Sequence, residues 1–459
     1  METTPLTPAI TTPPSARGLA ILAVDIVLLI ILLNTLPFNE KANLGLALMC
    51  FIGVLWLTEA IHITITALLI PLMAVAFGLL NADGALKSFS NPIIFLFFGG
   101  FALATALHIQ GIDRLIANRV LMLAKGRLNV AVLMLFGVTA LLSMWISNTA
   151  TAAMMLPLAL GILTSLDPEK DRRTFIFLLL GIAYSASIGG FGTIVGSPPN
   201  AIAAAALGLD FFTWMKYGIP IMLILMPVMI GLLWLILRPN LSHKVEIKRE
   251  EIEWTQPRLL AMAIFALTVV CWIFSAQISK ALGGVSQFDS LIAVGAAVLI
   301  SVSGVANWKQ IQENTEWGVL ILFGGGLTLS AILKDSGASV VMANGIADLF
   351  GASHWFIIML AVATLIIFLT EFTSNTASAA LLVPVFATVA EALGMPPAAL
   401  TLIIGFGASC AFMLPVATPP NAIVFGSGFF RQMDMIKVGF WLNLVSIAVI
   451  TMFAWTFWK

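Results

Sequence analysis

The stretch SNTATAAMMLP, from Ser147 to Pro157, occurs again with small changes as SNTASAALLVP, from Ser374 to Pro384. Each copy begins with Ser-Asn-Thr and reaches, ten residues later, a proline that we expect to end a helix. The copies lie 227 residues apart, about half of the 459-residue chain. A motif that recurs at this distance indicates a structural unit that occurs twice.

Two further pairs of blocks keep the same order around these motifs. Upstream, LFFGGFALATAL from Leu96 pairs with LFGGGLTLSAIL from Leu322; downstream, GSPPNAIA from Gly196 pairs with ATPPNAIV from Ala417. The glycines of the upstream blocks favour close helix packing over a ligand role. Three paired blocks in one order indicate a duplicated unit that fills most of the chain.

The composition is that of a membrane protein. Hydrophobic residues make up 60% of the chain and charged residues 10%, and the mean hydropathy is +1.05. Soluble domains are about 45–50% apolar and about 25% charged. The formal net charge is zero, and the sequence has no basic patch with interleaved aromatic residues, so we expect no nucleic-acid partner.

Apolar runs of about 20 residues are long enough to cross a bilayer. Two apolar segments, 129–165 and 354–391, are interrupted by Ser-Asn-Thr, and we predict that each forms a re-entrant helical hairpin. The fold class is therefore an all-α polytopic membrane protein with two hairpins and about eleven transmembrane helices. We predict these crossings at 19–37, 43–60, 63–80, 92–110, 174–210, 216–238, 257–276, 287–304, 316–333, 398–427 and 437–458.

The basic residues predict the orientation. With the N-terminus inside, sixteen of the 22 Lys and Arg residues fall on the cytoplasmic side of these crossings and six fall outside, in line with the positive-inside rule. We therefore predict a cytoplasmic N-terminus, an external C-terminus and a cytoplasmic linker at 239–256. Because the two repeats begin on opposite sides of the membrane, their topology is inverted.

Two crossings contain adjacent prolines, Pro198-Pro199 and Pro419-Pro420. Proline removes a backbone donor and interrupts a helix, and broken backbone at membrane depth occurs where it is buried in protein or lines a cavity. Broken helices at corresponding positions of inverted repeats point to a transport site. The Ser-Asn-Thr motifs have a simpler alternative interpretation, because these residue types are also the preferred helix N-caps.

The residue types in these blocks suit an anion bound together with cations. Four helix N-termini, at roughly +0.5 charge each, supply roughly +2, which matches a dicarboxylate. Free carbonyl groups of unwound backbone suit Na⁺. None of the four blocks contains Arg, Lys or His, so we expect the anion to be held by dipoles, hydroxyl groups, amides and bound cations.

The paired Ser-Asn-Thr and Pro-Pro-Asn motifs resemble those of the divalent-anion/sodium symporter family, whose mammalian members form solute carrier family 13. The similarity covers roughly residues 40–459 and is strongest to the bacterial succinate-transporting INDY proteins. It implies a homodimer in the bacterial inner membrane, in which a scaffold domain anchors a transport domain that moves as an elevator. It also implies that Na⁺ is the co-transported ion.

The family's organisation, carried onto this chain, gives domain boundaries. It implies a cytoplasmic tail at 1–18, a first scaffold part with an interfacial helix at 19–128, a first transport half at 129–238, the linker at 239–256, a second scaffold part at 257–353 and a second transport half at 354–459. The transport halves comprise a hairpin, a broken helix and a helix, at 129–165, 174–210 and 216–238 and again at 354–391, 398–427 and 437–458.

The resemblance also implies the site residues. One sodium site is expected to involve Ser143, Ser147, Asn148 and Gly196, and the other Thr370, Thr373, Asn375 and Ala417. The substrate carboxylates are expected to meet Asn148, Thr149, Ser197 and Pro198 on one side, and Asn375, Thr376, Thr418 and Pro419 on the other. No catalytic residue is expected.

The expected function is secondary active transport, with sodium-coupled symport of C4 dicarboxylates such as succinate, fumarate and malate into the cytoplasm. A dicarboxylate exchanger and a citrate-preferring or proton-coupled relative stay open as alternatives. An enzyme is disfavoured, because the chain has no HExxH, GxSxG or CxxC motif, and without GxxxxGK[ST] it does not couple ATP to transport itself. Hairpins with occluding tips disfavour a passive channel.

Two acidic residues inside apolar segments stand out. Glu371 lies in the second hairpin, where a role in ion coupling and a structural hydrogen bond are both open. Asp25 lies in the first crossing, where we favour a hydrogen bond to a neighbouring helix.

The orientation can be tested by labelling. A cysteine placed in the linker 239–256 of a cysteine-free protein should resist a membrane-impermeant maleimide in whole cells, because the linker is predicted to be cytoplasmic. A cysteine replacing Lys459 is the positive control. Equal labelling of the two positions would reverse the predicted orientation.

Overall fold

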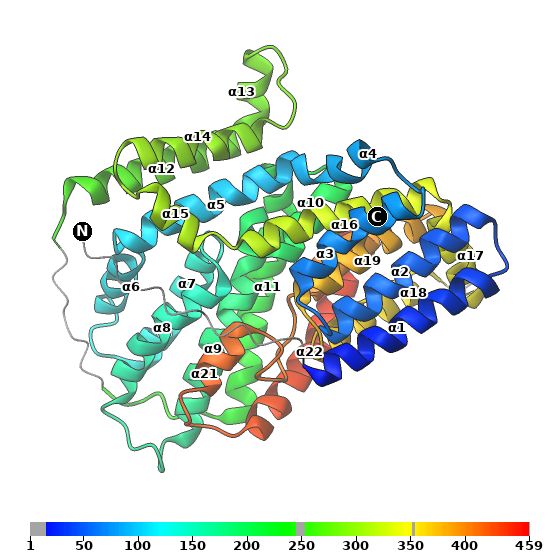
Figure 1. Ribbon diagram of the computed structural model, residues 1–459. Helices are drawn as coiled ribbons and strands as arrows, with labels where there is room; N and C mark the ends of the chain where they lie inside the picture. The colour runs from blue at the N-terminus through cyan, green and yellow to red at the C-terminus, as the bar shows by residue number, and fades with distance from the viewer. Residues whose placement is uncertain (1–14, 245–252, 351–353, 459) are drawn as a thin grey trace.

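The computed structural model describes residues 15–244, 253–350 and 354–458 and consists of helices joined by short connections (Figure 1). In these ranges no β-strand is present. The first half contains α1 (Ala16–Thr35), α2 (Glu40–Thr58), α3 (Ile63–Ala76), α4 (Ala82–Lys87), α5 (Pro92–Ile109), α6 (Ile112–Met122), α7 (Leu128–Ser143), α8 (Asn148–Leu163), α9 (Arg172–Gly189), α10 (Pro198–Leu207) and α11 (Phe211–Leu237).

The second half repeats this pattern. It contains α12 (Gln256–Ile273), α13 (Ser275–Ala281), α14 (Phe288–Val302), α15 (Trp308–Asn314), α16 (Trp317–Asp335), α17 (Ala338–Phe350), α18 (Trp355–Leu369), α19 (Asn375–Ala392), α20 (Pro397–Gly407), α21 (Pro419–Phe425) and α22 (Gln432–Phe457). In each half a short helix, α6 or α17, precedes a hairpin, a broken helix and a long final helix. The prediction of a duplicated all-helical fold is confirmed.

Nine helical segments of the described chain are long and apolar enough to cross a membrane. The predicted crossings at 63–80 and 287–304 are shorter helices, α3 and α14, of 14 and 15 residues. The crossing predicted at 398–427 is divided between α20 and α21. The hairpin helix α19 has the length of a crossing, 18 residues, which shows that length alone does not separate the two classes.

The N-terminal boundary differs slightly from the prediction. The first described residue is Ser15, so most of the predicted tail at 1–18 lies outside the described residues. The same is true of residues 245–252 of the predicted linker. Helix α1 starts at Ala16 rather than at 19, because the Ser15 hydroxyl caps it by accepting a hydrogen bond from the Gly18 N–H at 3.0 Å.

Both predicted hairpins are present. Helix α7 ends at Ser143 and α8 begins at Asn148, and the matching pair α18 and α19 is separated by residues 370–374. The expectation that Pro157 and Pro384 end their helices is wrong, because both lie inside α8 and α19. Neighbouring helices allow a proline to be tolerated within such a helix.

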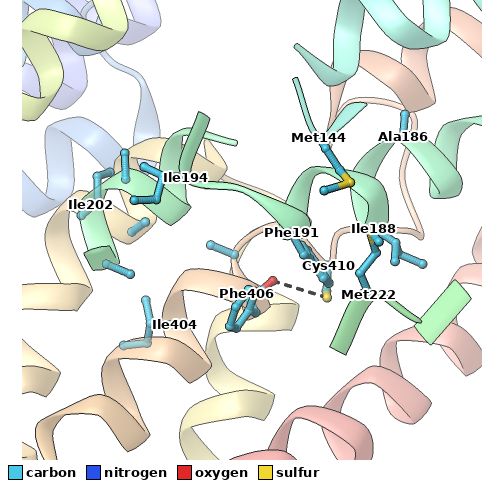
Figure 2. Close-up of a cluster of buried hydrophobic side chains, with 14 of the residues drawn as sticks. Met144, Ala186, Ile188, Phe191, Ile194, Ile202, Met222, Ile404, Phe406 and Cys410 are labelled. Atoms are coloured by element: carbon cyan, nitrogen blue, oxygen red, sulfur yellow. Dashed lines mark hydrogen bonds between the residues drawn. The ribbon is translucent and has the colours of Figure 1, made fainter. Parts of the chain in front are cut away.

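The second part of each broken helix packs against helices of the other half. Helix α10 of the first half packs against α19 and α20 of the second, and α21 of the second half packs against α8 and α9 of the first. The core between them includes Phe191 and Phe406, whose ring centroids lie 5.4 Å apart (Figure 2). This packing brings the two breaks, at Pro198 and Pro419 and thus 221 residues apart in sequence, into one region.

The repeated glycines are packing residues, as predicted. A Cβ atom on Gly99 of α5 would clash with the carbonyl oxygen of Ala293 in α14, and one on Gly325 of α16 would lie 2.8 Å from Ala67 of α3. These helices therefore approach each other closely enough to exclude any larger side chain.

The expectation for Asp25 is wrong. Its side chain is 1% exposed within α1, yet neither carboxylate oxygen has a hydrogen-bond partner. Helix α1 contacts α2 and otherwise lies at the edge of the molecule (Figure 1).

The glycine packing predicts a difference between two valine substitutions. Gly99→Val should lower the stability by about 1–3 kcal/mol or more, because the new side chain meets backbone that is fixed by its own helix. Gly137→Val in α7 is the matched control, since a Cβ atom there has nothing within 4 Å. Thermal unfolding in detergent measures both. If the Tm of Gly99→Val equalled that of Gly137→Val, the result would contradict the close approach of α5 and α14.

Candidate transport site

A cavity of about 310 Å³ lies where the two halves meet. Its wall contains both Ser-Asn-Thr motifs and both Pro-Pro-Asn blocks, which are far apart in sequence. The predicted site residues on its wall are Ser147, Asn148, Thr149, Gly196, Ser197, Pro198, Asn375, Thr376, Ala417, Thr418 and Pro419. The other three, Ser143, Thr370 and Thr373, are not on the wall.

The serines of the two Ser-Asn-Thr motifs are helix caps. Ser147 accepts a hydrogen bond from the Ala150 N–H at 3.3 Å at the start of α8, and Ser374 accepts one from the Ala377 N–H at 3.4 Å at the start of α19. The simpler interpretation of the motif is thus correct for its first residue. The Asn and Thr that follow each serine line the cavity, so capping does not account for them.

The Pro-Pro-Asn blocks supply two more helix N-termini. Pro198 and Pro419 occupy the first turn of α10 and α21, where a missing N–H costs nothing. The Thr418 hydroxyl caps α21, whereas the Ser197 hydroxyl forms a 3.0 Å hydrogen bond with Ser409 of the other half. Four helix N-termini therefore face one cavity, and its wall has no Lys, Arg or His side chain.

Oxygen atoms converge on Asn148 in the first half. With its NH₂ group facing them, the amide donates to the carbonyl oxygens of Ala186 at 3.0 Å and Gly196 at 3.2 Å, and it also contacts the Ser143 hydroxyl. If the Asn148 amide is rotated by half a turn, its oxygen lies beside the Ala186 and Gly196 carbonyl oxygens and the Ser143 hydroxyl. Such a set of hydroxyl, amide and carbonyl oxygens fits Na⁺, which unwound backbone commonly coordinates.

The corresponding oxygens of the second half are arranged differently. The Thr370 hydroxyl donates to the Ile367 carbonyl at 3.2 Å, and that of Thr373 donates to Leu369 at 2.9 Å and lies 2.8 Å from the Ser378 hydroxyl. The side-chain oxygen of Asn375 is enclosed without a hydrogen-bond partner, and an amide oxygen in this state suits a cation.

Two asparagines that the sequence analysis did not place in the site hold its backbone. The Asn200 amide donates to the carbonyls of Gly190 and Thr193, both at 2.8 Å. The Asn421 amide makes the equivalent bonds to Ala411 and Leu414, both at 3.0 Å. Each asparagine is the last residue of a Pro-Pro-Asn sequence. Its presence in both copies was the sequence feature that could have identified it as part of the site.

Glu371 also holds this backbone, but only in the second half. Its carboxylate accepts hydrogen bonds from the backbone N–H groups of Phe412, Met413 and Leu414 at 2.7, 2.9 and 3.1 Å. The Asn443 amide donates to it as well, at 2.7 Å. The structural hydrogen bond considered from the sequence is therefore present.

Two further acidic residues line the cavity. Glu59 follows α2 and Glu316 precedes α16. Neither belongs to a repeated motif, so the sequence carried no signal that would place them beside the Ser-Asn-Thr motifs.

Comparison with known proteins identifies the family. Residues 53–390, about three quarters of the chain, match the family described as citrate transporter. An uncharacterized transporter of Haemophilus influenzae is 60% identical over 95% of this chain and 96% of its own. The sodium-dependent dicarboxylate transporter SdcS of Staphylococcus saprophyticus is 33% identical over 93% of this chain and 88% of its own.

A solved structure supports the fold. The crystal structure of the YdaH transporter of Alcanivorax borkumensis aligns over 95% of both chains with a TM-score of 0.53 and 16% sequence identity. At this identity the similarity concerns the fold alone. The family match and the two relatives decide the assignment, and the chain therefore belongs to the citrate transporter family, whose members are membrane transporters and not enzymes.

Proposed function

We propose that this protein is a sodium-coupled symporter that brings C4 dicarboxylates, such as succinate, fumarate and malate, into the cytoplasm. The observation that supports this proposal best is the single cavity faced by four helix N-termini and free of basic side chains. A relative that is 33% identical is named a sodium-dependent dicarboxylate transporter.

The anion would bind through dipoles and hydroxyl groups. Four N-termini supply roughly +2 of partial charge, and their pseudo-symmetric placement suits one carboxylate on each side. One carboxylate would meet Asn148, Thr149, Ser197 and Pro198, and the other Asn375, Thr376, Thr418 and Pro419. Sulfate, with a single centre, would not span the two half-sites.

Bound cations would complete the charge balance. The first sodium site would use Ser143, Ser147, Asn148 and Gly196, and the second Thr370, Thr373, Asn375 and Ala417. Each Asn amide would then serve a cation and a carboxylate together. Two Na⁺ would neutralise a dianion, so electrogenic uptake requires a third.

We also propose an elevator mechanism for a homodimer in the bacterial inner membrane. The scaffold parts, 19–128 and 257–353, would stay fixed while the transport halves, 129–238 and 354–459, move. Small residues lie on the boundary between them: Gly100 of α5 faces Val195, and Gly326 of α16 faces Ala380 of α19. The absence of a side chain at these two glycines suits sliding of the transport halves along the scaffold.

Citrate is the second candidate substrate, because the family that residues 53–390 match is described as citrate transporter. A third carboxylate would require room beside the two half-sites. Glu59 and Glu316 on the cavity wall would repel it, which favours the dicarboxylate. Exchange of dicarboxylates and coupling to protons are the remaining alternatives, and the experiments below separate them.

Alanine substitution of either motif asparagine should abolish transport. Asn148→Ala and Asn375→Ala each remove a group proposed to serve two ligands, so we expect succinate uptake to fall at least about a hundredfold while the protein stays folded. Asn314→Ala is the control, because that side chain is exposed and bonds to its own helix at Gln310. Near-normal uptake by Asn148→Ala or Asn375→Ala would reduce the motif to a helix cap.

Coupling can be measured in proteoliposomes. Labelled succinate should accumulate against its gradient when Na⁺ is higher outside, with net inward movement of positive charge. Uptake should fall as the pH drops through the second pKa of succinate, because the monoanion leaves one half-site unpaired. Uptake that is independent of the Na⁺ gradient but is stimulated by internal dicarboxylate would indicate exchange instead of symport. Uptake driven by a proton gradient alone would indicate proton coupling.

A further inference from the structure

Four aromatic rings pack together where the proposed scaffold and transport parts meet. Trp145 follows α7 and Phe211 begins α11, so both belong to the first transport half. Phe265 and Trp272 lie on α12 of the second scaffold part. The Phe211 and Trp272 rings are stacked with their centroids 4.3 Å apart, and both side chains are fully buried. Trp145 meets Phe265 edge-on at 5.2 Å and lies parallel to Trp272 at 6.5 Å, and such pairs attract each other beyond the area that they bury.

Hydrogen bonds fasten the same contact. Asp289 lies in the first turn of α14, in the scaffold, and its Oδ2 accepts the backbone N–H of Phe211 at 2.7 Å. The Trp272 indole N–H donates to the backbone carbonyl of Asp289 at 3.0 Å. The first N–H groups of a helix have no acceptor within that helix. The scaffold therefore supplies an acceptor that the start of α11 needs.

The contact differs from two other places on the boundary. A Cβ atom on Gly100 of the scaffold would lie 2.8 Å from Val195, and one on Gly326 would lie 3.2 Å from Ala380. At these glycines the transport halves meet a surface without a side chain. Stacked rings and a hydrogen bond, in contrast, have their favourable geometry in one relative position only.

The contact and the cavity lie toward opposite sides of the membrane in the predicted topology. Phe211, Trp272 and Asp289 lie at or beside ends of crossings that are predicted to be external. Glu59 and Glu316, on the cavity wall, lie at ends predicted to be cytoplasmic. Among the described residues of the wall, none lies in a connection predicted to be external. On this orientation the cavity reaches the cytoplasmic side, which is the inward-facing arrangement of the proposed elevator.

We infer that Trp272 and Asp289 are positioning residues that hold the transport halves in the inward-facing position. This inference rests on the proposed elevator mechanism. The movement would carry Phe211 past the scaffold, so the stack and the hydrogen bond must separate before the site can face outward. A contact made in only one of two states shifts the population toward that state. Loss of a hydrogen bond to a carboxylate should therefore raise the outward-facing fraction about tenfold.

Labelling of a cavity residue from outside measures that fraction. Val416 is on the cavity wall and 85% exposed. In an otherwise cysteine-free protein, Val416→Cys should react with a membrane-impermeant maleimide in whole cells only while the site faces outward. The labelling rate then follows the outward-facing fraction. Asp289→Ala and Trp272→Leu should each raise this rate about tenfold.

Two scaffold substitutions away from the contact are the matched controls. Asp83→Ala changes an exposed carboxylate in α4, and Trp308→Leu removes a ring that packs on Phe98 within the scaffold. Both should leave the labelling rate within about twofold of the parent. Phe211→Leu makes the same test from the transport side if Trp272→Leu does not fold. Its effect should not add to that of Trp272→Leu, because both remove one stack.

Three results would overturn the inference. The first is an outside labelling rate that stays at the control value in the folded variants. The second is an equal rise from the cytoplasmic face, measured in inside-out vesicles, because a general loosening exposes Val416→Cys on both faces whereas loss of the contact acts on the outside rate alone. The third is an absence of outside labelling under every condition, with Na⁺ and succinate included, in which case the proposed elevator fails and the inference fails with it.

Discussion

Backbone that leaves a helix inside a membrane needs hydrogen-bond partners within the protein, and the rest of this structure depends on how that need is met. Asn200 and Asn421 each donate to two carbonyls of the unwound segment that precedes them. In each break one asparagine thus satisfies two backbone carbonyls, so that a helix can stop before the cavity and start again beside it. Two of the four helix N-termini that face the cavity, those of α10 and α21, follow from these two breaks.

The same breaks explain how an anion can be held without a basic side chain. Partial charges at helix ends are fixed in direction and cost no reorganisation when the ligand arrives, whereas a lysine or arginine at this depth would itself need a partner when the ligand leaves. On the proposed mechanism, mobile cations supply the remaining charge and depart with the anion. The empty site then contains no uncompensated positive side chain, which favours its return.

Much of this architecture could be predicted because the motifs that mark it occur twice in the sequence. The Ser-Asn-Thr motifs and the paired prolines located both hairpins and both broken helices, and the paired glycines marked close packing. The continuation of α8 and α19 through Pro157 and Pro384 could not be predicted, because neighbouring helices decide whether a proline is tolerated. Nor could the positions of Glu59 and Glu316 on the cavity wall, which depend on contacts between distant segments.

The differences between the two copies are as informative as their similarity. Each half places the Asn and Thr of its Ser-Asn-Thr motif on the cavity wall, and such a wall suits a substrate with two equal ends. Some of the groups that hold the unwound backbone behind the wall are, in contrast, not repeated. Glu371 accepts three backbone N–H groups in the second copy, whereas Met144 stands in its place in the first. The wall of the cavity can therefore stay alike in the two copies while the backbone behind it is held differently in each.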